Sequence, residues 1–160
     1  MPGQTAYTVL PAVGLSGQIL DDAFNLITSY PAGELISVGR ACEVVAGVLR
    51  MCQTTGAALG NVVGVSCYIG AREPGQFAIG DMVPVLRRGK IFADWNGTTQ
   101  VEFAVPNVNH SSTIATNRGV FTDAATSAGA GVEIAAAPSG CIEVRPTGMA
   151  TVCLVELNLP

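Results

Sequence analysis

Few residues in this 160-residue chain could do chemistry. Its single histidine, His110, lies in the stretch NVNHSST, directly before Ser111 and Ser112. Neighbours in sequence do not form a nucleophile–base pair, and the chain has no GxSxG motif. A Cys–His pair formed across the fold, for instance between His110 and Cys67 or Cys141, stays open. The polar residues around His110 favour a histidine in a loop instead.

The five cysteines are widely spaced and include no CxxC pair: Cys42, Cys52, Cys67, Cys141 and Cys153. With only one histidine beside them, these spacings match no usual zinc site, and reduced cysteines acting as small apolar core residues account for them. The sequence has no HExxH, GxxxxGK[ST] or strand-borne GxGxxG motif. We therefore predict that the protein is not an enzyme and that it binds no metal and no cofactor.

Charge is scarce: charged residues make up 12% of the chain and the net charge is -4, against about 25% charged residues in typical domains. The only basic cluster, Arg87, Arg88 and Lys90, is too small to follow a nucleic-acid backbone, and it suits either a charged turn or a contact with an acidic partner. Residues 1–20 and 51–71 carry no charge, but polar residues and glycines interrupt them. We therefore expect a soluble protein with no nucleic-acid or membrane partner, whose surface is partly covered by other proteins.

Val, Ile and Thr are abundant, and glycines and prolines interrupt them at short intervals, which predicts an all-β fold. We expect a jelly roll, a small β-barrel or a sandwich that forms one domain over residues 18–160. An antiparallel meander is expected within Ile79–Val105. Its strands would be Met82–Leu86, Ile91–Trp95 and Val101–Val105, joined by turns at Arg88-Gly89-Lys90 and Asn96-Gly97.

Further strands are expected at Asn25–Tyr30, Val62–Ile69, Ile142–Arg145 and Thr151–Leu157. Residues 38–51 fit a strand better than a helix, because Val44, Val45 and Val48 lie among them together with Gly47. Residues 123–140 are rich in Ala, Gly and Ser and predict a loop or a short helix.

Residues 1–17 differ from the rest of the chain. Prolines and glycines prevent regular structure there, while Tyr7, Val9, Leu10 and Val13 are apolar. This pattern predicts an extended N-terminal arm that contacts another surface, for instance by strand addition. The single tryptophan, Trp95, could anchor an interface or pack in the core.

Several motifs occur together between Gly64 and Gly97: Gly64-Val65, Gly80-Asp81, Val83, Val85-Leu86, Gly89 and Ile91-Phe92. In this order and spacing they resemble the structural cement (capsid decoration) proteins of tailed bacteriophages. Gly39–Glu43 with Gly47, the glycine-rich segment Pro11–Gly17 and the final segment Val152–Pro160 resemble the same family. The resemblance covers residues 11–97 and 141–160 and is weak over residues 98–140.

The resemblance implies a β-barrel or jelly-roll-like fold, a small homo-oligomer and no catalysis. We favour a homodimer, with a homotrimer as the alternative. It also implies a virion protein that is assembled in the host cytoplasm, binds the outer surface of the assembled capsid and stabilises it by bridging major capsid protein subunits. A head-fibre base or a host-surface adhesin is the alternative. The residues expected at interfaces are Tyr7, Val9, Leu10, Val13, Arg87, Arg88, Lys90 and Trp95.

Overall fold

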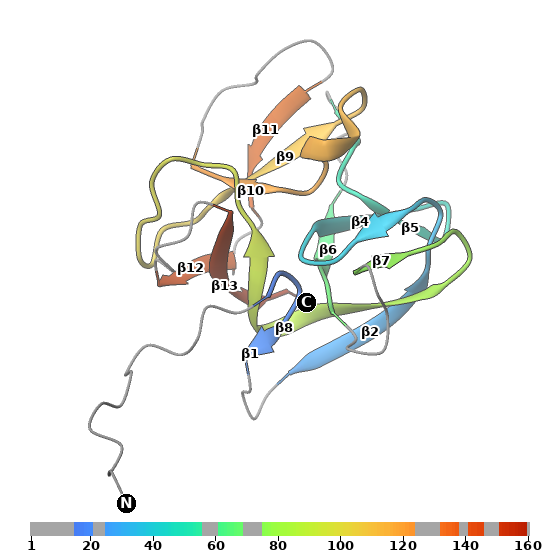
Figure 1. The fold of residues 1–160 in the computed structure, drawn as a ribbon, viewed down its shortest axis with the longest axis horizontal. Coiled ribbons are helices and arrows are strands. Elements are labelled where there is room, and N and C mark those ends of the chain that lie inside the picture. Colours follow the sequence, from blue (N-terminus) through green and yellow to red (C-terminus); the bar gives the residue numbers. More distant parts are fainter. Residues whose placement is uncertain are drawn as a thin grey trace, which may run out of the picture.

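The computed structural model describes residues 15–20, 25–55, 61–68, 75–123, 132–137, 141–145 and 151–159, and nearly all of its regular structure is β (Figure 1). Its strands are β1 (Ile19–Leu20), β2 (Leu26–Pro31), β3 (Ile36–Ser37), β4 (Ala41–Val45), β5 (Val48–Met51), β6 (Val62–Ser66), β7 (Gln76–Phe77), β8 (Met82–Asp94), β9 (Asn107–Ser111), β10 (Phe121–Thr122), β11 (Val132–Ala136), β12 (Cys141–Arg145) and β13 (Val152–Asn158). A single 3₁₀ turn is described, at Ala115–Asn117. No helix in these ranges is long and apolar enough to cross a membrane.

The long strand β8 organises the fold. The main sheet has the order β12-β13-β8-β6-β4-β5, and β1 and β2 also pair with β8. The first half of β8 pairs with β2 and β6, and its second half pairs with β1 and β13. A three-stranded sheet, β10-β9-β11, and the small pair β3-β7 complete the described fold, and all ladder pairings are antiparallel.

The part of the main sheet around the first half of β8 closes on itself. Ala32, just after β2, forms a parallel bridge with Leu49 of β5, and the Gly33 amide donates a 2.8 Å hydrogen bond to the Leu49 carbonyl. Strands β2, β8, β6, β4 and β5 thereby form a small barrel-like unit. Its buried residues include Ile36, Leu49, Phe77, Val83 and Val85. The all-β prediction is confirmed. Of the three architectures that the sequence allowed, a jelly roll, a small β-barrel and a sandwich, the small barrel describes this unit.

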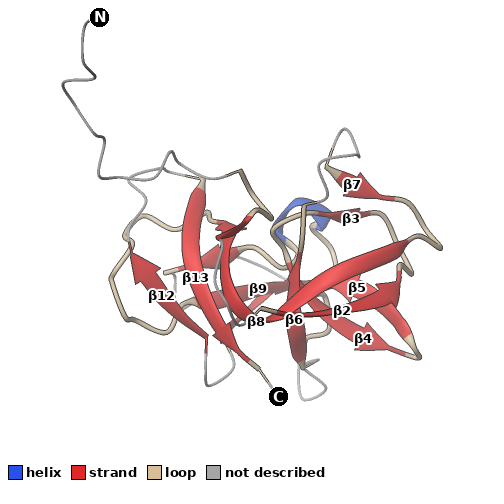
Figure 2. Cartoon of the chain, turned by 90° about the horizontal axis from the view of Figure 1, so that it is seen from below, coloured by secondary structure: helices blue, strands red, loops and turns tan. Residues whose placement is uncertain are grey.

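A second core lies where the other half of β8 and its partner β13 pack against the three-stranded sheet. Trp95, Val108, Phe121, Val155 and Leu157 are among its buried residues. Figure 2 shows β8 passing from the β12–β13 side of the molecule to the β2–β6 side. One strand therefore contributes to both cores.

The meander expected within Ile79–Val105 is wrong. Met82–Asp94 is one continuous strand, so Arg88-Gly89-Lys90 is not a turn. Gly89 has a φ of +123°, and the Asn25 side chain occupies the place where a Cβ would lie. A register shift between Leu26 and Ile27 lies opposite this point. The glycine and the bulge bend the strand, and partners on both edges keep it in the sheet.

The second expected hairpin turn, Asn96-Gly97, also does not join two strands. The Asp123 carboxylate accepts hydrogen bonds from the amides of Thr98 and Thr99, so the chain after Gly97 follows Asp123 and does not pair with β8. A two-residue hairpin turn occurs instead at Ala46-Gly47, where φ is +52° and +83°. Positive φ at both positions is typical of a type I′ turn. It joins β4 to β5, so the strand interpretation of residues 38–51 is confirmed.

The other expected strands correspond to β2, β6, β12 and β13. Residues 132–136 form strand β11 on β9, which corrects the expected loop or helix there, while 124–131 and 138–140 lie outside the described residues. Most of the N-terminal arm, residues 1–14, also lies outside them. Gly17 belongs to the body of the fold, because its amide donates to the Phe92 carbonyl at 2.6 Å and its carbonyl accepts from the Tyr68 amide at 2.7 Å.

Candidate interaction surface

Three exposed apolar side chains lie close together in the connection between β8 and β9. Val101 is 52% exposed, Phe103 69% and Val105 50%. We call residues 101–105 the apolar turn. Their alternate positions within one exposed segment make this segment a candidate for contact with another protein.

Both ends of this connection are fixed to the body of the protein. Asp123 accepts a 2.6 Å hydrogen bond from the Thr99 amide and 2.9 Å bonds from the amide and hydroxyl of Thr98. The Gln100 side chain donates to the Val152 carbonyl at 2.9 Å, and the Ala137 amide donates to the Pro106 carbonyl at 2.9 Å. The apolar turn is therefore presented on a well-anchored loop.

Asp123 is held in its charged form by this loop. Burial would raise the pKa of its carboxyl, but the hydrogen bonds from Thr98 and Thr99 outweigh burial and lower the pKa below its usual value of 3.8. Because a carboxyl with a lowered pKa stabilises the fold above its ordinary pKa, this anchor persists at neutral pH and weakens only in acid.

The backbone of the apolar turn is itself unusual. The Ala104 amide donates to the Val101 carbonyl at 3.2 Å, and Phe103 between them has a φ of +62°. A bulky side chain in this left-handed region costs on the order of 1–3 kcal/mol, and such strain is concentrated at functional sites. The Phe103 ring on this strained turn lies at the surface.

The basic residues expected at an interface lie elsewhere, in the middle of β8. Arg88 is exposed, whereas Arg87 and Lys90 are half-buried. Arg88 pairs in register with Asn158 of β13, and Lys90 pairs with Glu156. Arg88 and Lys90 therefore share the outer face of the sheet, and Arg88 also lies opposite the exposed Leu26 of β2.

The other predicted interface residues divide into two groups. Trp95 is 4% exposed and belongs to the second core, so core packing describes it and it offers no surface to a partner. Tyr7, Val9, Leu10 and Val13 lie outside the described residues. The structure thus does not bring Trp95 together with the basic residues. The apolar turn was not among the predicted interface residues, because the sequence predicted a strand at Val101–Val105.

The glycine-containing motifs that carried the resemblance have a structural role. A Cβ on Gly39 would collide with Ser16, and a Cβ on Gly17 would collide with Val38 and with the Tyr68 backbone. Ser16 also donates to Asp94, which pairs with Arg40. These motifs therefore fasten the segment before β1 to the segment before β4 and to the end of β8.

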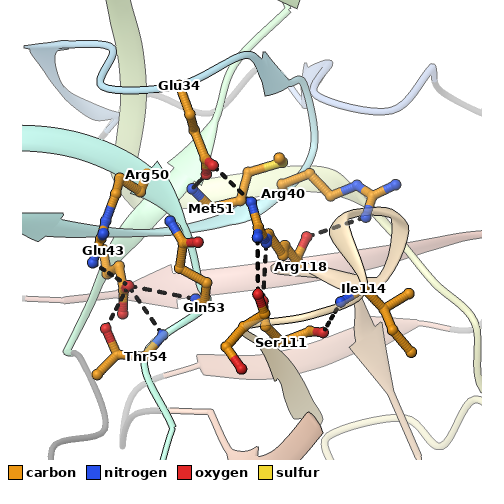
Figure 3. A network of polar contacts seen from close by, with 11 residues as sticks. Glu34, Arg40, Glu43, Arg50, Met51, Gln53, Thr54, Ser111, Ile114 and Arg118 are labelled. Atoms are coloured by element: carbon orange, nitrogen blue, oxygen red, sulfur yellow. Dashed lines mark hydrogen bonds and ion pairs between the residues drawn. The ribbon is translucent and has the colours of Figure 1, made fainter. Parts of the chain in front are cut away.

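A surface depression of about 420 Å³ is bordered by Glu34, Arg40 and Arg118, but its charges are already engaged. Arg118 pairs with Glu34 at 2.9 Å and donates to the Ser111 carbonyl at 2.9 Å (Figure 3). Arg40 donates to the Thr116 carbonyl at 2.7 Å. Because these arginines tie the 3₁₀ turn and β9 to the main sheet, we interpret the depression as part of the scaffold.

The described structure therefore combines an all-β body, an apolar turn held by hydrogen bonds at both ends, and arginines that join its elements. The family model described as structural cement protein (E217 gp24/Pam3 gp6) matches residues 3–155. The chain belongs to this family of phage structural cement proteins, and its class is therefore that of a virion structural protein.

A solved structure has the same fold. It is a chain from "The capsid of Myoviridae Phage XM1", with a TM-score of 0.69 and 15% sequence identity, and the similarity covers 99% of this chain and 98% of that chain. A search of curated proteins finds no match.

Proposed function

We propose that this protein binds the outer surface of an assembled phage capsid and stabilises the capsid by bridging major capsid protein subunits. The observation that carries the proposal is membership of the structural cement family over residues 3–155. The scarcity of charge, 12% of the chain, supports it, because surfaces that are covered in an assembly need less charge than a free monomer.

The apolar turn is the capsid contact that we propose among the described residues. A stable interface buries about 800 Å² per partner and draws most of its binding energy from a few aromatic or arginine anchors. Phe103, at 69% exposure on an anchored loop, provides such a residue. Because the loop is already fixed, little conformational entropy is lost when it docks.

We propose that the arm and the outer face of β8 add further contacts. Tyr7, Val9, Leu10 and Val13 would lie along a neighbouring sheet edge, and Arg87, Arg88 and Lys90 would face acidic capsid surface. A homodimer, or a homotrimer, would let one oligomer of this protein contact several capsid subunits at once. Linked sites can raise affinity by roughly 10²–10⁴ over a single contact.

Stabilisation then follows from mass action, since a ligand that binds only the assembled shell shifts the equilibrium towards the shell. Heads that lack this protein should disrupt at a lower temperature than heads to which the purified protein has been added back. Release of packaged DNA during heating, followed with a dye, measures the difference. An unchanged disruption temperature with every site saturated would contradict the stabilising role.

A further inference from the structure

We propose that Glu43, Cys52 and His110 form a zinc-binding site inside the protein. One carboxylate oxygen, the thiol sulfur and one ring nitrogen lie within 4.8 Å of one another, and all three residues are buried. Glu43 comes from β4, Cys52 directly follows β5, and His110 lies on β9. The three residues are far apart in sequence, and the tertiary fold alone brings them together.

Two atoms of this cluster are buried without a hydrogen-bond partner: Oε2 of Glu43 and Nδ1 of His110. Glu43 is 0% exposed and His110 is 3% exposed. Leaving a buried polar atom unpaired destabilises the fold, and each such atom in a folded protein needs an explanation. A shared cation would satisfy both atoms.

The remaining polar atoms of the two side chains are bonded in the way that metal ligands usually are. Oε1 of Glu43 accepts hydrogen bonds from the Thr54 hydroxyl at 2.7 Å and the Thr54 amide at 3.2 Å, and it also faces Arg50 at 3.5 Å (Figure 3). His110 is hydrogen-bonded to the Thr54 backbone. Since Nδ1 has no partner, the bond uses Nε2. Such outer bonds fix the orientation of metal-binding histidines and carboxylates.

The same bond argues against a catalytic Cys–His–Glu triad. A relay needs one ring nitrogen for the thiol and the other for the carboxylate. Here Thr54 occupies one nitrogen, so Cys52 and Glu43 would have to share the other. Burial is the largest cause that raises the pKa of the Cys52 thiol well above its usual value, followed by the nearby Cys42 and Glu43. A neutral buried thiol is a poor nucleophile.

One sulfur, one nitrogen and one oxygen ligand suit Zn²⁺ best among the common divalent ions. Zinc bond lengths of about 2.0–2.3 Å in a tetrahedron place ligand atoms roughly 3.3–3.6 Å apart, so the three atoms, now within 4.8 Å of one another, must close by at most about 1.5 Å. The Cys52 thiol would lose its proton to solvent on binding, and water would complete the fourth position. The ion would join the main sheet to the three-stranded sheet.

The test uses the full-length protein after treatment with a chelator. Titration with ZnCl₂ against a chromophoric chelator should show one tight site per chain and a raised melting temperature. Co²⁺ in place of Zn²⁺ should give a thiolate-to-cobalt charge-transfer band, which reports a cysteine ligand in the unmutated protein. Absence of this band, or no stoichiometric zinc binding by folded protein, would overturn the proposal.

Two cysteine variants locate the site. Cys52→Ser should weaken zinc binding by at least about 100-fold, because it removes a metal ligand. Loss of a ligand should weaken binding at least as much as loss of a residue that hydrogen-bonds to a ligand. Cys67→Ser is the matched control, since Cys67 is also a buried free cysteine but lies outside the cluster. Equal loss in both variants would contradict the assignment. If Cys52→Ser does not fold, the cobalt spectrum of the unmutated protein decides the question.

Discussion

Replacing Phe121 with alanine should lower the free energy of unfolding by about 3–5 kcal/mol, as truncation of a buried phenylalanine typically does. Phe121 is 0% exposed in the second core. It pairs in register with Val108 on β9 and forms a bridge with Trp95, directly after β8. The ring therefore fills the space between the two sheets, and its removal leaves a cavity that the surrounding backbone cannot close.

Urea unfolding followed by the fluorescence of Trp95 measures this loss. Phe103→Ala is the matched control, because it removes the same atoms from a ring that is 69% exposed. Its effect on stability should stay within about 0.5 kcal/mol, or be slightly favourable if alanine tolerates the left-handed backbone better. Similar losses in the two variants would contradict the placement of Phe121 in the core.

The second expected effect concerns binding, where the roles of the two phenylalanines are reversed. Phe103→Ala should weaken attachment to phage heads by about 2 kcal/mol per site, which is roughly 30-fold and typical of an aromatic anchor. In an oligomer the loss at several linked sites would be larger. The expected cause is the loss of apolar contact area, because the loop itself remains fixed by Asp123.

Co-sedimentation of the variant with heads that lack the protein, over a range of concentrations, gives the affinity. Ile79→Ala serves as the control, because Ile79 is 75% exposed but lies outside the apolar turn. If Ile79→Ala weakens binding and Phe103→Ala does not, the capsid contact lies on another face.

The strand content could be predicted from the sequence because Val, Ile and Thr runs between glycines and prolines favour pleated structure locally. The continuity of β8 could not be predicted from the sequence. Arg88-Gly89-Lys90 has the composition of a turn, and only β1, β2 and β13, which are distant in sequence, hold it in a sheet. In the same way, Asp123 redirects the chain after Asn96-Gly97, and Ala46-Gly47 makes the hairpin with a less typical residue pair.

The candidate sites could not be predicted from the sequence for the same reason, because they also depend on residues that are distant along the chain. Alternating Val101, Phe103 and Val105 predicted a strand, but no strand of the described part of the chain pairs with this segment. His110 was expected in a polar loop, but it lies buried on β9, and the cysteine that the structure groups with it and Glu43 is Cys52. The sequence gives no sign that these residues lie close together, because they are far apart along the chain and only the packing of the two sheets brings them together.

The most direct test of the proposed function compares assembled heads with unassembled major capsid protein. Purified protein should co-sediment with heads that lack it, reach a fixed number of copies per head, and show no binding to free capsid subunits under the same conditions. Equal binding to free subunits and to heads, or no binding to heads, would contradict the proposal that this protein recognises the assembled capsid.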